Sequence, residues 1–209
     1  MKIGIPKERR NGETRVGATP ETVKKLHALG LEIVLESSAG EGSHFYDNSY
    51  REAGAEIGDR AAAFGTDVIF KVDKPTRDEI RLMKKGAALV CNLDMCHDDG
   101  TWSALAEQGV EAFALEMIPR ISRAQTMDTL SSQANIAGYR ATLEAARLYG
   151  RFLPMMMTSA GSAKPARVYV LGAGVAGLQA IATARRLGAQ VFGYDVRTEV
   201  KEQVQSLGA

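Results

Sequence analysis

Little in this 209-residue sequence points to a metal centre or a membrane. The two cysteines, Cys91 and Cys96, match no zinc pattern even with Asp94 and His97 nearby. We interpret both as ordinary thiols of a reducing compartment. No apolar run approaches the roughly 20 residues that span a bilayer, and the N-terminus lacks the apolar core of a signal peptide. These absences predict a soluble, cytoplasmic protein with no bound metal and no membrane span of its own.

An excess of charge of one sign is also absent, because 26 basic residues face 25 acidic ones. No dense basic cluster and no interleaving of basic with aromatic residues occurs, which argues against nucleic acid as a partner. Hydrophobic residues make up 45% of the chain, enough for a sizeable core in one domain or two small ones.

Short apolar runs alternate with helical patterns in the first half of the chain, which is typical of a parallel α/β sheet. Strands are predicted at residues 2–5, 31–35, 67–72, 87–93 and 110–117. Helices are predicted after Thr19-Pro20, which provide an N-cap and a proline at the first helical position, and at residues 48–53, 76–84 and 100–108.

One long helix is predicted at residues 128–149, where Ile136, Tyr139, Leu143 and Ala146 recur at helical spacing. A loop or linker is expected at 152–165, then a strand at 167–171, a helix at 175–187, a strand at 190–196 and a helix at 198–207. The predicted fold class is α/β, with two Rossmann-like parallel-sheet subdomains joined by a long helix. The first is a flavodoxin-like subdomain (1–127), the helix spans 128–150, and residues 151–209 form the beginning of an incomplete Rossmann subdomain, whose ligand the glycine motif below indicates.

A glycine motif follows the first strand of that second subdomain. Gly172 would permit a tight turn, Gly174 would let the backbone approach a pyrophosphate, and Gly177 would let helix and strand pack closely. The helix that begins at Val175 would present N–H groups and its positive end to the phosphates. Asp195, at the end of the next strand, would accept hydrogen bonds from the hydroxyls of the adenosine ribose. The complete motif in this context predicts an NAD(H) site.

Plainer interpretations of the same residues stay open. Arg197, two residues after Asp195, would in principle favour NADP. A glycine-rich turn also occurs in Rossmann-like domains that bind no dinucleotide, and in others that bind S-adenosylmethionine or FAD instead. Asp195 by itself is also compatible with a solvated acid at the end of a strand.

A polar loop at residues 119–133 precedes the long helix and lies beyond the end of a parallel strand, where open α/β sheets place their ligands. From spacing alone the simpler interpretation is structural, because Asp128 or Ser131 would make a helix N-cap worth about 1 kcal/mol.

Segments along the whole chain carry a resemblance to a known family. They lie at residues 4–8, 13–16, 19–20, 120–125, 127–128, 130–135, 154–157, 172–179 and 195–197. With them the chain resembles domain I, the NAD(H)-binding domain in the alpha subunit of proton-translocating NAD(P) transhydrogenases.

The resemblance implies that NADH is held here, that a separate domain III holds NADP(H), and that hydride passes directly between the two nicotinamides. A membrane domain would couple this transfer to proton movement, so the chain would lie at the inner face of the cell membrane through its partners, as a homodimer. Arg120, Asp128 and Ser131 would orient the carboxamide, and Gln125 would reach the ribose and, through it, the NADP site. The match at Asp195-Val196-Arg197 adds these three residues to the cofactor site.

The alternative enzyme is alanine dehydrogenase, which shares this fold and N-terminus and uses a lysine and a histidine. Asp73 stands where its Lys-Val-Lys-Glu-Pro motif carries the catalytic lysine, and Asp94-Met95 stands where its His-Leu motif falls. Arg15 is retained, but alone it cannot provide general acid–base catalysis.

A third hypothesis is that these 209 residues act only as a structural or interaction module. They contain only a βαβα portion of a doubly wound sheet, so we expect an unpaired strand edge and an exposed apolar helix face. The isolated piece is therefore expected to bind NAD(H) weakly or not at all and to be inactive alone.

Overall fold

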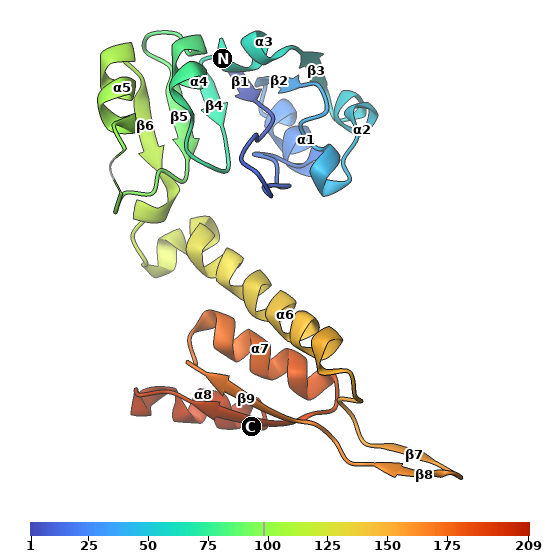
Figure 1. Ribbon diagram of the computed structural model, residues 1–209. Helices are drawn as coiled ribbons and strands as arrows, with labels where there is room; N and C mark the ends of the chain where they lie inside the picture. Colours follow the sequence, from blue (N-terminus) through green and yellow to red (C-terminus); the bar gives the residue numbers. More distant parts are fainter. Residues whose placement is uncertain (98) are drawn as a thin grey trace. The chain divides into compact units, whose positions relative to one another are not determined.

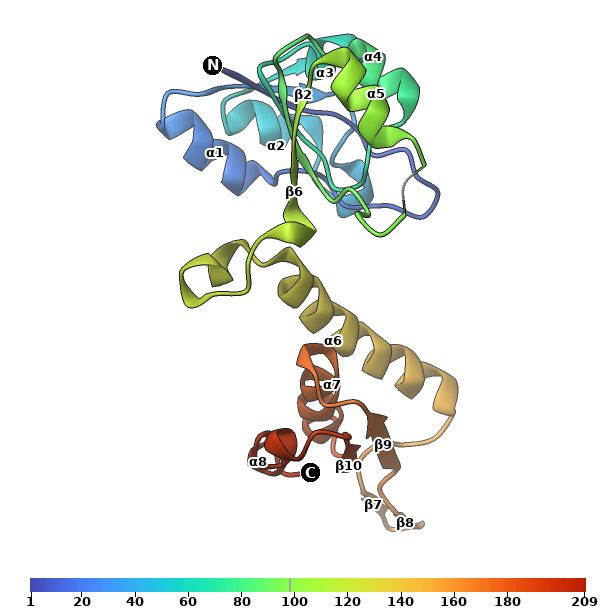
Figure 2. The same cartoon turned by 90° about the vertical axis from the view of Figure 1, so that its left-hand side faces the viewer.

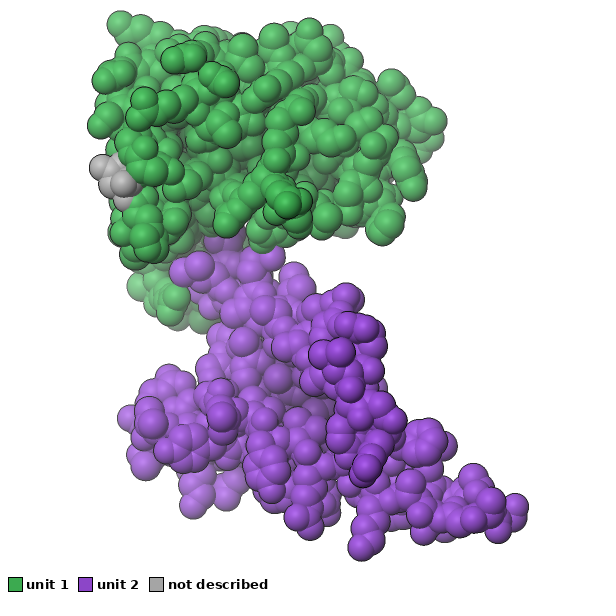
Figure 3. All heavy atoms as spheres, in the orientation of Figure 1, with its two compact units in different colours: residues 1–127 green, residues 128–209 purple. Residues whose placement is uncertain are grey.

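The computed structural model describes residues 1–97 and 99–209, which form two compact units, residues 1–127 and 128–209 (Figure 3). Each unit is built around a parallel sheet with its own buried apolar cluster. The α/β class and the two Rossmann-like sheets predicted from the sequence are confirmed.

The first unit contains a six-stranded parallel sheet in the order β3-β2-β1-β4-β5-β6 (Figure 1). Its strands are β1 (Lys2–Ile5), β2 (Glu32–Glu36), β3 (Ala55–Gly58), β4 (Val68–Phe70), β5 (Ala88–Cys91) and β6 (Glu111–Ala114). This is the doubly wound order of dinucleotide-binding folds and differs from the flavodoxin order 2-1-3-4-5. The flavodoxin-like topology expected for this subdomain is therefore corrected.

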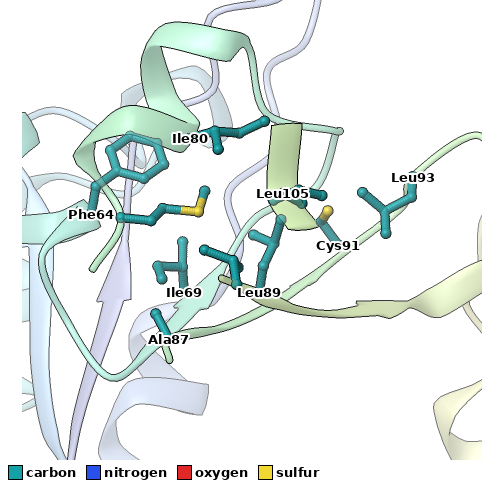
Figure 4. Packing of buried hydrophobic residues seen from close by; sticks show 10 residues of the cluster. Phe64, Ile69, Ile80, Ala87, Leu89, Cys91, Leu93 and Leu105 are labelled. Atoms are coloured by element: carbon teal, nitrogen blue, oxygen red, sulfur yellow. The ribbon is translucent and has the colours of Figure 1, made fainter. Parts of the chain in front are cut away.

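Two groups of helices cover the two faces of this sheet. On one face, Ile5 and Leu35 pair in register and pack against α1 (Pro20–Ala28) and α2 (Asp47–Glu52). On the other, Ile69 and Leu89 pair in register and pack against α3 (Arg60–Phe64), α4 (Arg77–Leu82) and α5 (Thr101–Gln108). Figure 4 shows Phe64 among the side chains gathered over these strands. Because both faces are covered, the carboxyl ends of the strands are left to hold ligands.

Three details of this unit differ from the prediction. β3 and α3 were not expected, because both are short and β3 carries a single large apolar residue, Ile57. Asp59 is the N-cap of α3, and its carboxylate accepts a hydrogen bond from the N–H of Ala62 at 2.8 Å. The last predicted strand ends at Ala114 and continues as a 3-10 turn, η2 (Leu115–Met117); two further turns are η1 (Glu41–Ser43) and η3 (Ser122–Met127).

The second unit is a βαβ motif with a long helix against it (Figures 1 and 2). β9 (Arg167–Leu171), α7 (Val175–Arg186) and β10 (Gln190–Tyr194) form the motif, followed by η4 (Thr198–Val200) and α8 (Lys201–Ser206). The long helix α6 (Thr129–Tyr149) packs against α7 and belongs to this unit. Where a loop was predicted, β7 (Met156–Thr158) and β8 (Gly161–Ala163) form an antiparallel hairpin that extends away from the motif.

One face of the β9–β10 sheet lacks a covering layer in the described part of the chain. Tyr169 and Phe192 stack on it with ring centroids 4.9 Å apart, and Leu171 and Tyr194 beside them are exposed. The sequence led us to expect an exposed apolar face on a helix. In the structure α6 packs against part of α7, and exposed apolar side chains lie on the sheet as well. No helix among the described residues has the length and apolar character needed to cross a membrane.

Candidate functional site

The glycine turn of the second unit joins the end of β9 to the start of α7. Gly172 has φ +96°, a left-handed conformation that glycine adopts without strain. A Cβ atom on Gly177 would lie 1.8 Å from the carbonyl oxygen of Gly172, so the first turn of the helix packs directly on the loop backbone. These two glycines fold the turn as the sequence predicts, with Val175 as the first residue of α7.

Gly174 plays a different role, because a Cβ atom there would meet nothing within 4 Å. Its backbone is extended (φ −79°, ψ −168°), and as the N-cap of α7 it offers no side-chain hydrogen bond to the helix. Space is thus open beside Gly174, at the positive end of a 12-residue helix whose first N–H groups have no partner within the helix. This arrangement fits a pyrophosphate, whose oxygens require N–H donors and close approach of the backbone.

Asp195, just beyond β10, is tied to this turn. Its Oδ2 accepts a hydrogen bond from the N–H of Ala173 at 2.7 Å, and its Oδ1 accepts from the N–H and Nε of Arg197 at 2.9 and 3.1 Å. Nη2 of Arg197 also reaches Oδ2 at 3.2 Å. The bonds from Arg197, followed by that from Ala173, hold the pKa of the Asp195 carboxyl well below its usual range.

The carboxylate is therefore a charged acceptor at neutral pH. A carboxylate offers about four lone-pair sites, and the four hydrogen bonds from Ala173 and Arg197 already occupy them. To bind this carboxylate, a ribose diol would have to displace the Arg197 guanidinium. Val196, which lies between Asp195 and Arg197 in the sequence, is exposed. The residues of the turn and of the β10 end fit the adenosine and pyrophosphate of a dinucleotide.

The polar loop is divided between the two units. Arg120 and Gln125 belong to the first unit and are exposed, Gln125 within η3. Asp128 and Ser131 belong to the second unit and form the N-cap of α6. There Asp128 accepts a hydrogen bond from the Ser131 N–H at 2.9 Å and another from its hydroxyl at 2.6 Å. The capping role considered from spacing is therefore present at Asp128.

A charged cleft of about 610 Å³ lies in the first unit, beyond the carboxyl ends of β1 and β4. These strands flank the point where the strand order reverses, the usual ligand position of such sheets. At its base Lys71 contacts Glu8 at 2.9 Å and Glu79 at 3.7 Å, with all three side chains almost fully buried. Asp73 pairs with Arg10 at 2.9 Å.

Two further acids and their partners belong to this region. Asp94 has a left-handed backbone (φ +53°) and contacts His97 at 3.0 Å. Arg15 donates to both carboxylate oxygens of Glu13, at 2.8 and 2.6 Å, which lowers the pKa of Glu13 to about 2. Cys91 is buried, which raises its thiol pKa, while Cys96 is exposed.

Residues 4–137 match the family model described as alanine dehydrogenase/PNT, N-terminal domain, and residues 141–209 match the corresponding C-terminal domain. The chain belongs to the alanine dehydrogenase/PNT family. The resemblance inferred from the sequence is thus confirmed at the level of the family.

Individual relatives within the alanine dehydrogenase/PNT family agree with this membership. An NAD(P) transhydrogenase subunit alpha protein of Rhodospirillum rubrum is 52% identical over 215 residues, covering all of this chain and 56% of that protein. The crystal structure of transhydrogenase from Sinorhizobium meliloti is 51% identical with a TM-score of 0.98, covering all of this chain and 63% of that one. A structure of L-alanine dehydrogenase is 31% identical with a TM-score of 0.87, covering 99% of this chain and 58% of that one. The chain spans about half the length of the curated relatives it matches.

Sequence reasoning missed two features of the site. The buried Lys71 group was missed because Glu8 and Glu79 are far from it in the sequence. The close contact of α6 with α7 at Gly138 was missed because only the apolar positions of the long helix were considered. The spacing of small residues, Gly138 with Thr142 and Ala176 with Ala180, is the signal that indicates such a contact.

Proposed function

We propose that the chain is the NAD(H)-binding component of a proton-translocating NAD(P) transhydrogenase. The observation that carries the proposal is the open start of α7, with Gly174 free of neighbours and Asp195 fixed beside it. The names of the relatives from Rhodospirillum rubrum and Sinorhizobium meliloti favour a transhydrogenase over other users of this motif.

The chain's own residues would divide the work of holding NAD(H). The N–H groups at Val175 and the following residues would bind the pyrophosphate, with Gly172, Gly174 and Gly177 shaping the turn. Asp195 would accept from the adenosine ribose hydroxyls, with Val196 and Arg197 beside the adenosine. The bound nicotinamide supplies the hydride chemistry.

At the nicotinamide end the chain would position rather than react. Arg120, Asp128 and Ser131 would orient the carboxamide, and Gln125 would contact the ribose. Hydride transfer between two nicotinamides releases no proton locally, so none of the four needs to act as an acid or base. Correct placement of the donor carbon accounts for catalysis.

The second candidate, an alanine dehydrogenase, is favoured by the L-alanine dehydrogenase fold and by Arg15. The charged cleft of the first unit opposes it. The alanine dehydrogenase motifs carry the lysine and the histidine at the positions of Asp73 and Asp94, and these two acids pair here with Arg10 and His97. A structural module without activity is the remaining candidate, favoured by the uncovered β9–β10 face.

Partner chains follow from the proposal. A domain III would bring NADP(H), a membrane domain would couple the transfer to protons, and the chain would lie at the inner face of the cell membrane through them. A second copy of the chain would complete a homodimer; the exposed β7–β8 hairpin, which carries Met156 and Met157, supports a contact of this kind.

The test is hydride transfer by the intact protein together with its partner subunits. We expect reduction of NADP⁺ by NADH and no oxidation of L-alanine with NAD⁺. Oxidation of L-alanine, or NADH binding without any transfer to NADP⁺, would contradict the proposal.

A further inference from the structure

Helices α6 and α7 touch backbone to backbone at one point. Gly138 is buried there, and a Cβ atom on it would lie 2.0 Å from the carbonyl oxygen of Ala176 and 2.8 Å from its carbonyl carbon. Only a hydrogen atom fits in this space. The separation of the two helices is therefore set by the absence of a side chain at residue 138.

Two polar contacts join the helices, and the first of them shows how the helices are aligned along their lengths. The hydroxyl of Thr142 lies 3.1 Å from the carbonyl of Gly138 in its own helix and 3.3 Å from that of Ala180 in α7. Nδ2 of Asn135 donates to Oε1 of Gln179 at 3.2 Å. Thr142 and Ala180 are 38 residues apart, the same offset as the close pair at Gly138, so the two helices run in the same direction (Figures 1 and 2).

This alignment places the start of α6 beyond the start of α7. Val175, the first residue of α7, lies level with residue 137 of α6. Ser131 and Asp128 are six and nine residues earlier, which corresponds to about 9 and 13 Å of helix at 1.5 Å per residue. A dinucleotide with its pyrophosphate at the start of α7 would extend alongside this projecting part of α6.

We propose that Gly138 is a positioning residue, which sets the distance of Asp128 and Ser131 from the nicotinamide half of the bound dinucleotide. The inference rests on the proposed NAD(H) site and names the residue that adjusts it. α7 itself cannot yield, because Gly177 packs on the carbonyl of Gly172 and holds the helix to the turn. A side chain at residue 138 would therefore displace α6 and leave the pyrophosphate site in place.

The test is Gly138→Ala in the intact protein, measured with two probes. A real Cβ contact is about 3 Å or longer, so α6 must move by at least about 1 Å, enough to stretch a hydrogen bond from Asp128 or Ser131 beyond its normal length. Because such a bond contributes about 1.5–3 kcal/mol, we expect the Kd for NADH to rise about 10- to 100-fold, while the Kd for ADP-ribose, which lacks the nicotinamide, changes less than about 2-fold.

Ala137→Gly is the matched control, because Ala137 is exposed on the same helix and the change weakens the helix by about 1 kcal/mol without entering the contact. It should leave both Kd values unchanged. Thr142→Val keeps the shape of the side chain but removes its hydroxyl from Ala180, and it should weaken NADH alone about 3- to 10-fold even if Gly138→Ala does not fold.

Two results would overturn the inference: Gly138→Ala or Thr142→Val weakening NADH and ADP-ribose equally, or neither variant changing NADH affinity. Failure of the unaltered protein to bind NADH would be a different outcome, because it contradicts the proposed function before Gly138 is tested.

Discussion

Replacing either of two glycines in the same turn with alanine should weaken NADH binding, but only one of the two replacements should also lower stability. At Gly174 a methyl group would point into open space, and its extended backbone suits alanine. We expect Gly174→Ala to cost less than about 1 kcal/mol of stability, the scale of an N-cap change. The same methyl group would occupy the space through which the pyrophosphate must approach the helix.

The expected loss of binding follows from the hydrogen bonds that the methyl group would prevent. A hydrogen bond to a charged group contributes about 1.5–3 kcal/mol, and each 1.4 kcal/mol is a tenfold change in affinity. Loss of one such bond should therefore raise the Kd for NADH about 10- to 100-fold in Gly174→Ala. NADH fluorescence titration and urea unfolding of the intact protein measure the two quantities.

Gly177→Ala is the counterpart, because its methyl group would lie 1.8 Å from the carbonyl oxygen of Gly172. Overpacking of this kind costs about 1–3 kcal/mol or more, so this variant should lose stability as well as NADH. The reasoning is refuted if Gly174→Ala binds NADH as the unaltered protein does, or if Gly177→Ala unfolds at the same urea concentration as the unaltered protein.

Three further changes test other regions of the structure. Asp195→Asn should release the Arg197 guanidinium toward a 2′-phosphate and raise the affinity for NADPH relative to NADH at least about 10-fold; an unchanged ratio of the two Kd values would contradict this. Lys71→Met would leave the buried Glu8 carboxylate without its cation, while Glu79 would keep Arg60 at 3.3 Å, and should cost about 3–5 kcal/mol in urea unfolding; a loss under about 1 kcal/mol would show that the group is not coupled. Because Arg15 lowers the pKa of Glu13 to about 2 from 4.5, their pair should stabilise the fold above about pH 5 and cease to do so as the pH falls toward 2. Melting temperatures over that range should therefore fall more steeply for the unaltered protein than for Glu13→Gln, and parallel curves would refute the assignment.

The elements that the sequence predicted well are those with strong local signals. Thr19 caps α1, Asp128 caps α6, and the alternation of apolar runs identified five of the six strands of the first sheet. The glycine turn was predictable because each glycine answers a local backbone requirement that does not depend on distant residues. A short strand such as β3 gains its stability from pairing with β2, which no local pattern reveals.

Contacts between distant segments explain the remaining differences. The β7–β8 hairpin contains Gly161 and small side chains that also suit a loop, so its pairing could not be inferred. Gly138 acquires its meaning only from Ala176 in the neighbouring helix. Asp195 was predicted as a ribose acceptor, but its bonds to Ala173 and Arg197 depend on how the turn and the end of β10 meet.

A crystal structure of the intact protein with NADH tests the central claim most directly. The account predicts pyrophosphate oxygens about 2.7–3.2 Å from the N–H groups at the start of α7, next to Val175. It also predicts the hydroxyls of the adenosine ribose on the Asp195 carboxylate, with Arg197 moved aside. A dinucleotide bound elsewhere, or at this turn without contact to Asp195, would contradict the account.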